Sequence, residues 1–207
     1  MLRLKDAMDM PSEIRSTVPG MAALRDAAGR SIADDAEAIA HACHAIARRF
    51  HGGGKLIVFG DGASATDASH VAVEFLHPVI VGKRALPALA LTNDPATMTA
   101  VANVRGFGEV FAYQLGCFAD PGDIALGISP DGNCTNVVRA LDVARGRGLL
   151  TLALVGGDGG AVARGHLADH VLIARAAEPA VVKELHVTMY HLLWELVHVF
   201  LESGAVR

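Results

Sequence analysis

A glycine-containing run ahead of two polar side chains has the residue types and spacing for metal binding or proton transfer. The run reads Gly60-Asp61-Gly62-Ala63-Ser64-Ala65. Its glycines allow a tight turn, so the free N–H groups that begin the next helix can face an anionic ligand. His70 and Glu74 follow, four residues apart, which places them on one helical face. An imidazole and a carboxylate so placed can share a metal ion or exchange a proton.

A second polar loop, Ser129-Pro130-Asp131-Gly132-Asn133-Cys134, follows the apolar segment 124–128. Ser129 and the amides after it are suited to holding phosphate oxygens at a helix N-terminus. Asp131 opposes this, because a carboxylate repels phosphate and is itself a common helix cap. Anion or sugar binding and a structural turn therefore both stay open for this loop. Cys134 lies at the end of this loop, just before the next helix, a position where the helix N-terminus can acidify a thiol.

The third group of candidate residues lies on a long helix predicted near residues 181–203. Lys183 and His191 are eight residues apart and lie close to one helical face, whereas His186 is displaced from it. A single histidine is more often packed or solvated than functional. His191 becomes a candidate if its helix packs beside the helix that follows the first loop.

Apolar strands and amphipathic helices alternate from residue 55 onward and would position these residues. Strands are predicted near 55–59, 86–91, 123–128, 149–155 and 170–174, and their continuous apolar runs are typical of a buried parallel sheet. Right-handed crossovers predict a three-layer α/β/α sandwich with a five-stranded parallel sheet. Ligands of such sheets bind at the carboxyl ends of the strands, where both loops lie.

A helical region, residues 1–54, precedes the core of residues 55–207. No linker separates the two parts, so the chain is best treated as one structural domain. Ile32, Ile39 and Ile46 follow helical spacing and form one apolar stripe. This stripe predicts packing either on the chain's own sheet or on a second subunit.

The bulk composition argues against several classes of protein. A net charge of -4 over 207 residues disfavours nucleic acid as a direct partner. The three cysteines, Cys43, Cys117 and Cys134, lack CxxC spacing, which argues against a disulfide framework and a zinc ribbon. The N-terminus does not read as a signal peptide, and no apolar run reaches the roughly 18 residues of a membrane span. We therefore expect a cytoplasmic protein without a membrane partner.

The segment 60–74, the loop 129–134, and Glu184 with His186 and His191 together resemble sugar isomerase (SIS) domain proteins. The similarity extends over nearly the whole chain. Within this family the chain is similar to phosphoheptose isomerases, which interconvert sedoheptulose 7-phosphate and a manno-heptose 7-phosphate. It is also similar to non-catalytic members such as the DnaA initiator-associating factor. The resemblance implies a homotetramer in which the N-terminal helices and the last helix pack between subunits.

The resemblance also implies roles for particular residues. Glu74 and His191 take the acid–base positions, and His70 joins them around a zinc ion. The substrate would be bound where the two loops converge, completed by two further polar residues and by the last helix from a neighbouring subunit. The substrate-binding residues implied in this way are Asp61, Gly62, Ser64, Asp94, Asn103, Ser129, Asp131, Cys134 and Lys183.

This chain departs from the family pattern at ligand-contacting positions. Asp131 and Cys134 replace serines, and Lys183 replaces a glutamine that binds the metal in the family. A protonated lysine has no lone pair and adds positive charge, so Lys183 disfavours zinc and can pair with Glu74 instead. Zinc is therefore possible but not required, although three protein ligands and a water suffice for a catalytic zinc.

Two functions fit these residues. An aldose–ketose isomerase needs a base for the proton next to the carbonyl and an acid that moves protons between oxygens. Glu74 and His191 can supply both, so the sequence predicts an isomerase of sedoheptulose 7-phosphate or a related anionic sugar. The alternative is a carbohydrate-binding or protein-interaction module that kept the fold and lost turnover, because fold does not establish function.

Overall fold

The computed structural model describes residues 12–206, with side chains from residue 17 onward. Two long helices come first, α1 (Ser12–Asp34) and α2 (Ala36–His51). The first 11 residues of the helical region predicted over 1–54 lie outside the described range. Along the described residues, no helix combines the length and apolar content that a membrane crossing requires.

Strands and helices alternate after α2, as the sequence predicts. The strands are β1 (Leu56–Gly60), β2 (Ala88–Ala90), β3 (Ile124–Ser129), β4 (Leu150–Gly156) and β5 (His170–Ala174). The helices are α3 (Ala63–Leu76), α4 (Pro95–Arg105), the 3-10 helix η1 (Phe107–Glu109), α5 (Val110–Phe118), α6 (Thr135–Gly146), α7 (Gly160–Arg164) and α8 (Pro179–Ser203). All five strands pair in parallel, in the order β2-β1-β3-β4-β5. The predicted five-stranded parallel sheet is confirmed.

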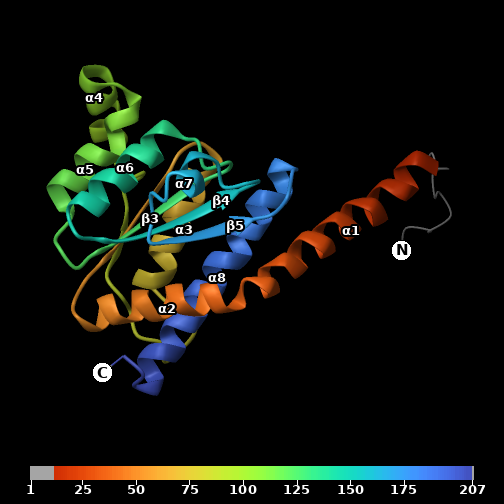
Figure 1. Ribbon diagram of the computed structural model, residues 1–207, viewed down its shortest axis with the longest axis horizontal. Helices are drawn as coiled ribbons and strands as arrows, with labels where there is room; N and C mark the ends of the chain where they lie inside the picture. The colour runs from red at the N-terminus through yellow and green to blue at the C-terminus, as the bar shows by residue number, and fades with distance from the viewer. Residues whose placement is uncertain (1–11, 207) are drawn as a thin grey trace, which may run out of the picture.

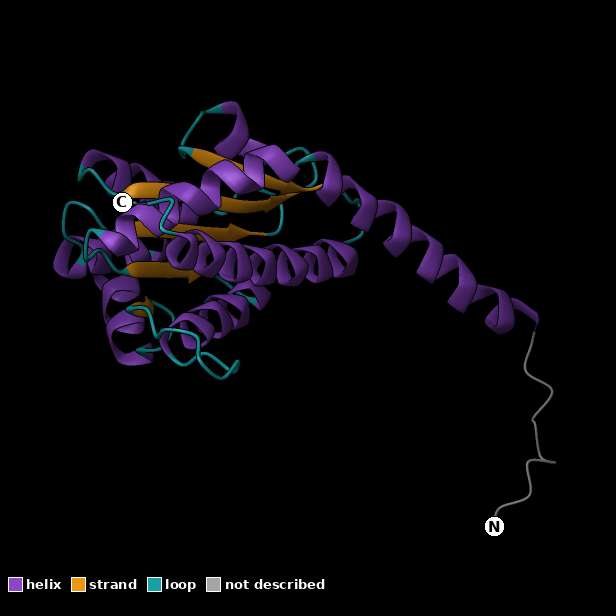
Figure 2. Cartoon of the chain, turned by 90° about the horizontal axis from the view of Figure 1, so that it is seen from below, coloured by secondary structure: helices purple, strands orange, loops and turns teal. Residues whose placement is uncertain are grey.

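The sheet is the middle of three layers, which Figure 2 shows nearly edge-on. Leu56 and Val58 of β1 face one core, which they share with α2, α3 and α8. The alternate residues Ile57 and Phe59 face a second core, shared with α5 and α6. Strands β1, β3 and β4 are buried along their whole length, which explains why their sequences are continuously apolar.

The N-terminal helices pack on this chain only in part. The isoleucines of the predicted stripe are buried in the core that contains α8, so own-sheet packing is correct for them. Figures 1 and 2 both show that α1 then extends beyond the body of the molecule. On this extension Val18, Met21 and Leu24 are 69%, 47% and 51% exposed. The apolar stripe of α1 is therefore covered by the core at its C-terminal end and exposed toward its N-terminal end.

Candidate active site

Two helices from distant parts of the chain carry the candidate site, α3 after β1 and α8 at the end (Figure 1). Three contacts fix how they lie: Asp67 with Lys183, Glu74 with His191, and the Glu74 carbonyl with the Trp194 indole. Higher residue numbers on α3 meet higher numbers on α8, so the two helices run in the same direction. Each turn of α3 therefore faces one particular turn of α8.

The carboxylate of Glu74 lies between two histidine rings. Its Oε1 atom is 3.3 Å from Nε2 of His70 and 3.1 Å from Nε2 of His191. The Glu74 side chain is 15% exposed, whereas those of His70 and His191 are 47% and 46% exposed. The cluster is thus sheltered on the carboxylate side and open on the histidine side, where a ligand can approach.

The three side chains suit the zinc ion that the family resemblance implies. Their ligand atoms all lie within 4.8 Å of one another. Two imidazoles and one carboxylate are a known donor set of catalytic zinc, with a fourth position left for water or substrate. The residues therefore fit the ion in number, type and proximity.

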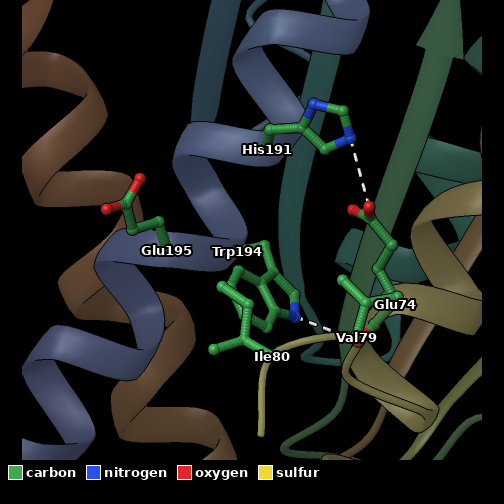
Figure 3. A pocket seen from close by; sticks show the side chains of 6 residues that line it. All are labelled: Glu74, Val79, Ile80, His191, Trp194 and Glu195. Atoms are coloured by element: carbon green, nitrogen blue, oxygen red, sulfur yellow. Dashed lines mark hydrogen bonds and ion pairs between the residues drawn. The ribbon is translucent and has the colours of Figure 1, made fainter. Parts of the chain in front are cut away.

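A hollow of about 270 Å³ opens beside this cluster. Figure 3 shows Glu74 and His191 pointing toward each other at its edge, while Glu195 points away. Trp194 forms part of the wall, and its Nε1 donates a hydrogen bond of 3.0 Å to the Glu74 backbone carbonyl. Exposed apolar residues of the loop after α3 complete the wall. The hydrogen bond from Trp194 to the Glu74 carbonyl holds the last turn of α3 against α8.

A second hollow of about 220 Å³ lies at the first turn of α3. Helix α3 begins after Gly62 without a side-chain cap, and the Ser64 and Ala65 amides donate to the Asp61 and Gly62 carbonyls at 2.9 Å and 3.1 Å. Ser64, Lys183 and His186 are among the lining residues. Burial lowers the pKa of His186, and its Nε2 has no hydrogen-bond partner among the described residues. The Asp61 and Asp67 carboxylates also line the second hollow, so it presents charges of both signs.

Lys183 does not pair with Glu74, and that prediction was wrong. Its ammonium lies 2.6 Å from Oδ1 of Asp67 and donates to the Ala63 carbonyl at 3.0 Å and the Thr66 hydroxyl at 3.2 Å. Because α3 and α8 run in the same direction, Lys183 faces the first turns of α3 and not its last. The positive charge is therefore neutralised by Asp67, away from the two histidines.

The loop after β3 forms hydrogen bonds with itself. The carboxylate of Asp131 accepts from the Asn133 amide at 2.9 Å, and the hydroxyl of Ser129 accepts from the Gly132 amide at 3.0 Å. Two amides that a phosphate would need therefore already have partners in the chain. Of the two interpretations that the sequence left open, this geometry favours the structural turn.

The two loops meet at the carboxyl ends of β1 and β3. Nδ2 of the buried Asn136 donates to Asp61 at 3.0 Å and joins the first loop to α6. Burial raises the pKa of the nearby Cys134 thiol; a hydrogen bond with Ser129 lowers it, and the Asp61 and Asp131 carboxylates raise it further. The net shift is upward, so the thiol is not acidified as its place at a helix start predicted.

Asp94 and Asn103 lie apart from both hollows. Asp94 caps α4, accepting from the amides of Ala96 and Thr97 at 3.0 Å and 3.1 Å, and hydrogen bonding with Thr97 lowers its pKa. Asn103 is exposed on the same helix, which packs mainly on η1 and α5. Neither residue lines the hollows beside α3 and α8. A role for them at this site stays a prediction that requires a second subunit.

A protein-family comparison matches most of this chain to one domain family. The model of the SIS domain matches residues 21–156, which is more than half of the chain. The chain belongs to the SIS-domain family.

Curated SIS-domain relatives match over most of the chain. A phosphoheptose isomerase from Solidesulfovibrio magneticus is 40% identical over 194 residues, covering 94% of this chain and 92% of the relative. A phosphoheptose isomerase from Crocosphaera subtropica is 40% identical over 168 residues, covering 81% of this chain and 85% of the relative.

Solved SIS-domain structures agree with the sequence matches. The phosphoheptose isomerase of Neisseria gonorrhoeae superposes with a TM-score of 0.82 at 30% identity, covering 89% of this chain and 98% of that one. A phosphoheptose isomerase from Francisella tularensis superposes with a TM-score of 0.81 at 31% identity, covering 91% of this chain and 98% of that one.

Sequence reasoning missed three residues of this SIS-domain site, although the spacing contained a signal for each. Asp67 precedes His70 by three residues and so shares its helical face. Tyr190 follows Lys183 by seven residues, and Trp194 follows Tyr190 by four, which places them on one stripe of α8. Extending the search along each helical face, and not only among histidines and carboxylates, would have found them.

Proposed function

We propose that this SIS-domain chain is an aldose–ketose isomerase of phosphorylated sugars, acting on sedoheptulose 7-phosphate or a related anionic sugar. The single observation that carries the proposal is the Glu74 carboxylate, whose Oε1 contacts His70 and His191 at once. The names of the relatives support the same reaction class, since those at about 40% identity are phosphoheptose isomerases.

The two proton transfers of the reaction match the two kinds of side chain. Glu74 removes the proton from the carbon next to the carbonyl and returns it to the adjacent carbon. His191 moves a proton between the two oxygens of the enediol, and its contact with Glu74 keeps both groups on one side of the substrate. A zinc ion bound by His70, Glu74 and His191 would polarise the carbonyl as a Lewis acid.

The second hollow offers a place for the anionic end of the substrate. The helix dipole at the start of α3 and the Lys183 ammonium attract a phosphate, and the Asp67 carboxylate that pairs with Lys183 opposes this attraction. A helix rises about 1.5 Å per residue, so His70 lies about 10 Å along α3 from Ala63. That separation is similar to the length of an extended heptose phosphate, whose carbonyl end would then reach the histidines.

One observation favours the non-catalytic alternative. The Asp131 carboxylate accepts from the Asn133 amide in the loop after β3, where a phosphate would otherwise be bound. A module that binds a sugar or a protein without turnover could tolerate this change. The two functions differ in one measurable property, the exchange of a carbon-bound proton.

Proton exchange at the carbon next to the carbonyl of sedoheptulose 7-phosphate, followed in deuterated water, tests the proposal. We expect exchange in the wild-type protein and a loss of about 10²- to 10⁴-fold in Glu74→Gln, because general base catalysis contributes about that much. Glu195→Gln is the matched control, since Glu195 lines the same hollow but points away from His191. No exchange in the wild type would support the binding module, and full exchange in Glu74→Gln would remove Glu74 from the mechanism.

The assembly and location follow the same proposal. We infer a homotetramer in the cytoplasm, in which neighbouring subunits cover the exposed stripe of α1 and bring Asp94 and Asn103 toward the hollows. Support for the assembly comes from the apolar side chains that α1 exposes beyond the body of the molecule.

A further inference from the structure

The His70 ring has a partner at each of its two nitrogens. Nε2 lies 3.3 Å from the Glu74 carboxylate, and Nδ1 lies 2.9 Å from the hydroxyl of Tyr190. Tyr190 is 1% exposed, and its ring contacts His70 edge-on with 5.4 Å between centroids. The hydroxyl thus reaches the site from a side chain fixed in the core, which makes it a rigid partner.

The chemistry of the two partners decides where the His70 proton lies. An ionised carboxylate only accepts hydrogen bonds, so a neutral ring that faces Glu74 carries its proton on Nε2. Nδ1 then accepts from the Tyr190 hydroxyl. A metal-binding His70 needs the opposite arrangement, with a lone pair on Nε2 and the proton on Nδ1, so the partner of Nδ1 must accept.

A hydroxyl differs in this respect from the usual partners of metal-binding histidines. Backbone carbonyls and carboxylates accept only, and so fix the proton on one nitrogen. A tyrosine hydroxyl can donate or accept by rotating its hydrogen. An ordinary tyrosine hydroxyl has a pKa of about 10, so it keeps its proton at neutral pH.

We propose that Tyr190 is a positioning residue that holds the His70 imidazole in either neutral tautomer, because its hydroxyl can donate to Nδ1 or accept from it. With the proton on Nε2, the ring presents its N–H to the Glu74 carboxylate 3.3 Å away; with the proton on Nδ1, the lone pair of Nε2 can ligate a divalent cation. When the tautomer changes, Nε2 releases its proton to solvent and Nδ1 takes one up from solvent, so the ring stays neutral; the exposed side chain of His70 allows this exchange. The inference rests on the proposed function in taking His70, Glu74 and His191 as the working cluster.

Zinc affinity of Tyr190→Phe, measured by competition with a chromophoric chelator, is the first test. We expect binding about 10- to 100-fold weaker than in the wild type, the usual effect of removing the partner of a metal-binding histidine. Tyr113→Phe is the matched control, because Tyr113 is the other tyrosine of the chain and lies exposed on α5. Unfolding in denaturant without metal identifies any loss of fold. Unchanged zinc affinity in Tyr190→Phe would overturn the proposal.

The nitrogen chemical shifts of His70 in the metal-free protein are the second test, which decides the matter if zinc binds too weakly to compare. We expect protonated Nε2 and hydrogen-bonded Nδ1 in the wild type, and an Nδ1 signal moved toward that of a free lone pair in Tyr190→Phe. Protonated Nδ1 in the metal-free wild type, or an unmoved signal in the variant, would overturn the proposal. Neither test reads turnover, so a failure of the proposed isomerase reaction is recognised separately, by the absence of proton exchange in the wild-type protein.

Discussion

Lys183 and Asp67 form an ion pair whose members differ in burial. The Asp67 side chain is 5% exposed and that of Lys183 39%, with 2.6 Å between Nζ and Oδ1. Removal of the lysine would leave a nearly buried carboxylate without its charge partner, which costs more than the loss of a surface pair. This pair therefore contributes to stability and fixes the Lys183 side chain at the second hollow.

We expect Lys183→Gln to lower the free energy of unfolding by about 1–2 kcal/mol, a value reduced for the partial exposure of the lysine. Lys83→Gln is the control, because its partner Glu202 is 55% exposed, and it should cost no more than about 0.5 kcal/mol. Urea unfolding of both variants makes the comparison. The double variant Lys183→Gln/Asp67→Asn should recover part of the loss. Equal stabilities of the two single variants would show that the buried carboxylate does not need its partner.

At the scale of elements, the loop after β3 is locked against the loop after β4. The Val162 amide donates to the Gly132 carbonyl at 3.1 Å, and a Cβ on Gly132 would lie 2.1 Å from the Gly159 carbonyl oxygen. Gly132 also has a φ of +71°, a left-handed conformation that disfavours other residues. Only glycine allows the two loops to approach so closely.

Gly132→Ala should lower the free energy of unfolding by at least about 2 kcal/mol, since backbone strain and a collision with backbone atoms add together. Gly116→Ala is the control, because Gly116 lies within α5 and an added Cβ meets nothing within 4 Å. That variant should gain about 0.5–1 kcal/mol from helix propensity. Chemical denaturation measures both. A neutral Gly132→Ala would mean that the two loops can separate without cost.

The sequence predicted the elements better than their mutual placement. The apolar runs of β1, β3 and β4 revealed the strands because these strands are buried on both faces. No local sequence pattern predicts which turns of α3 and α8 meet, since Asp67 and Lys183 are 116 residues apart. The pairing of Lys183 with Glu74 failed for this reason. Asp131 shows a further gap, because its carboxylate accepts from the Asn133 amide in a turn, and a turn and a ligand contact favour the same residue type.

At the scale of the whole molecule, α1 carries an apolar stripe that its own chain covers only at one end. Ile32 and Ala28 are buried, whereas Met21 and Val18, further along the same helical face, are exposed. A salt bridge of 2.7 Å from Arg25 to Glu184 fixes the direction of the helix. This continuation of a buried stripe into solvent is the basis for the proposed contact with another subunit.

Replacement of Val18, Met21 and Leu24 by lysine should convert the proposed tetramer to smaller species, because charge at these positions would have to be desolvated on association. Ala23→Lys/Asp26→Lys, on the opposite face of α1, is the control and should leave the assembly intact. Sedimentation velocity at micromolar concentration distinguishes the species. A wild-type monomer, or an unchanged assembly in the lysine variant, would contradict a role of α1 between subunits.

Because α3 and α8 run in the same direction, their contacts fix the distance between the two ends of the proposed site. The proposed substrate path runs along this pair of helices, from the start of α3 to the Glu74 cluster. A side chain can move along a helix only in steps of about one turn, 5.4 Å, if it is to keep facing the same way. One extra carbon lengthens a substrate by far less than such a step. We therefore expect SIS-domain proteins for shorter or longer sugar phosphates to differ from this chain by three or four residues in the spacing between the first loop and the acid–base pair, and not by one.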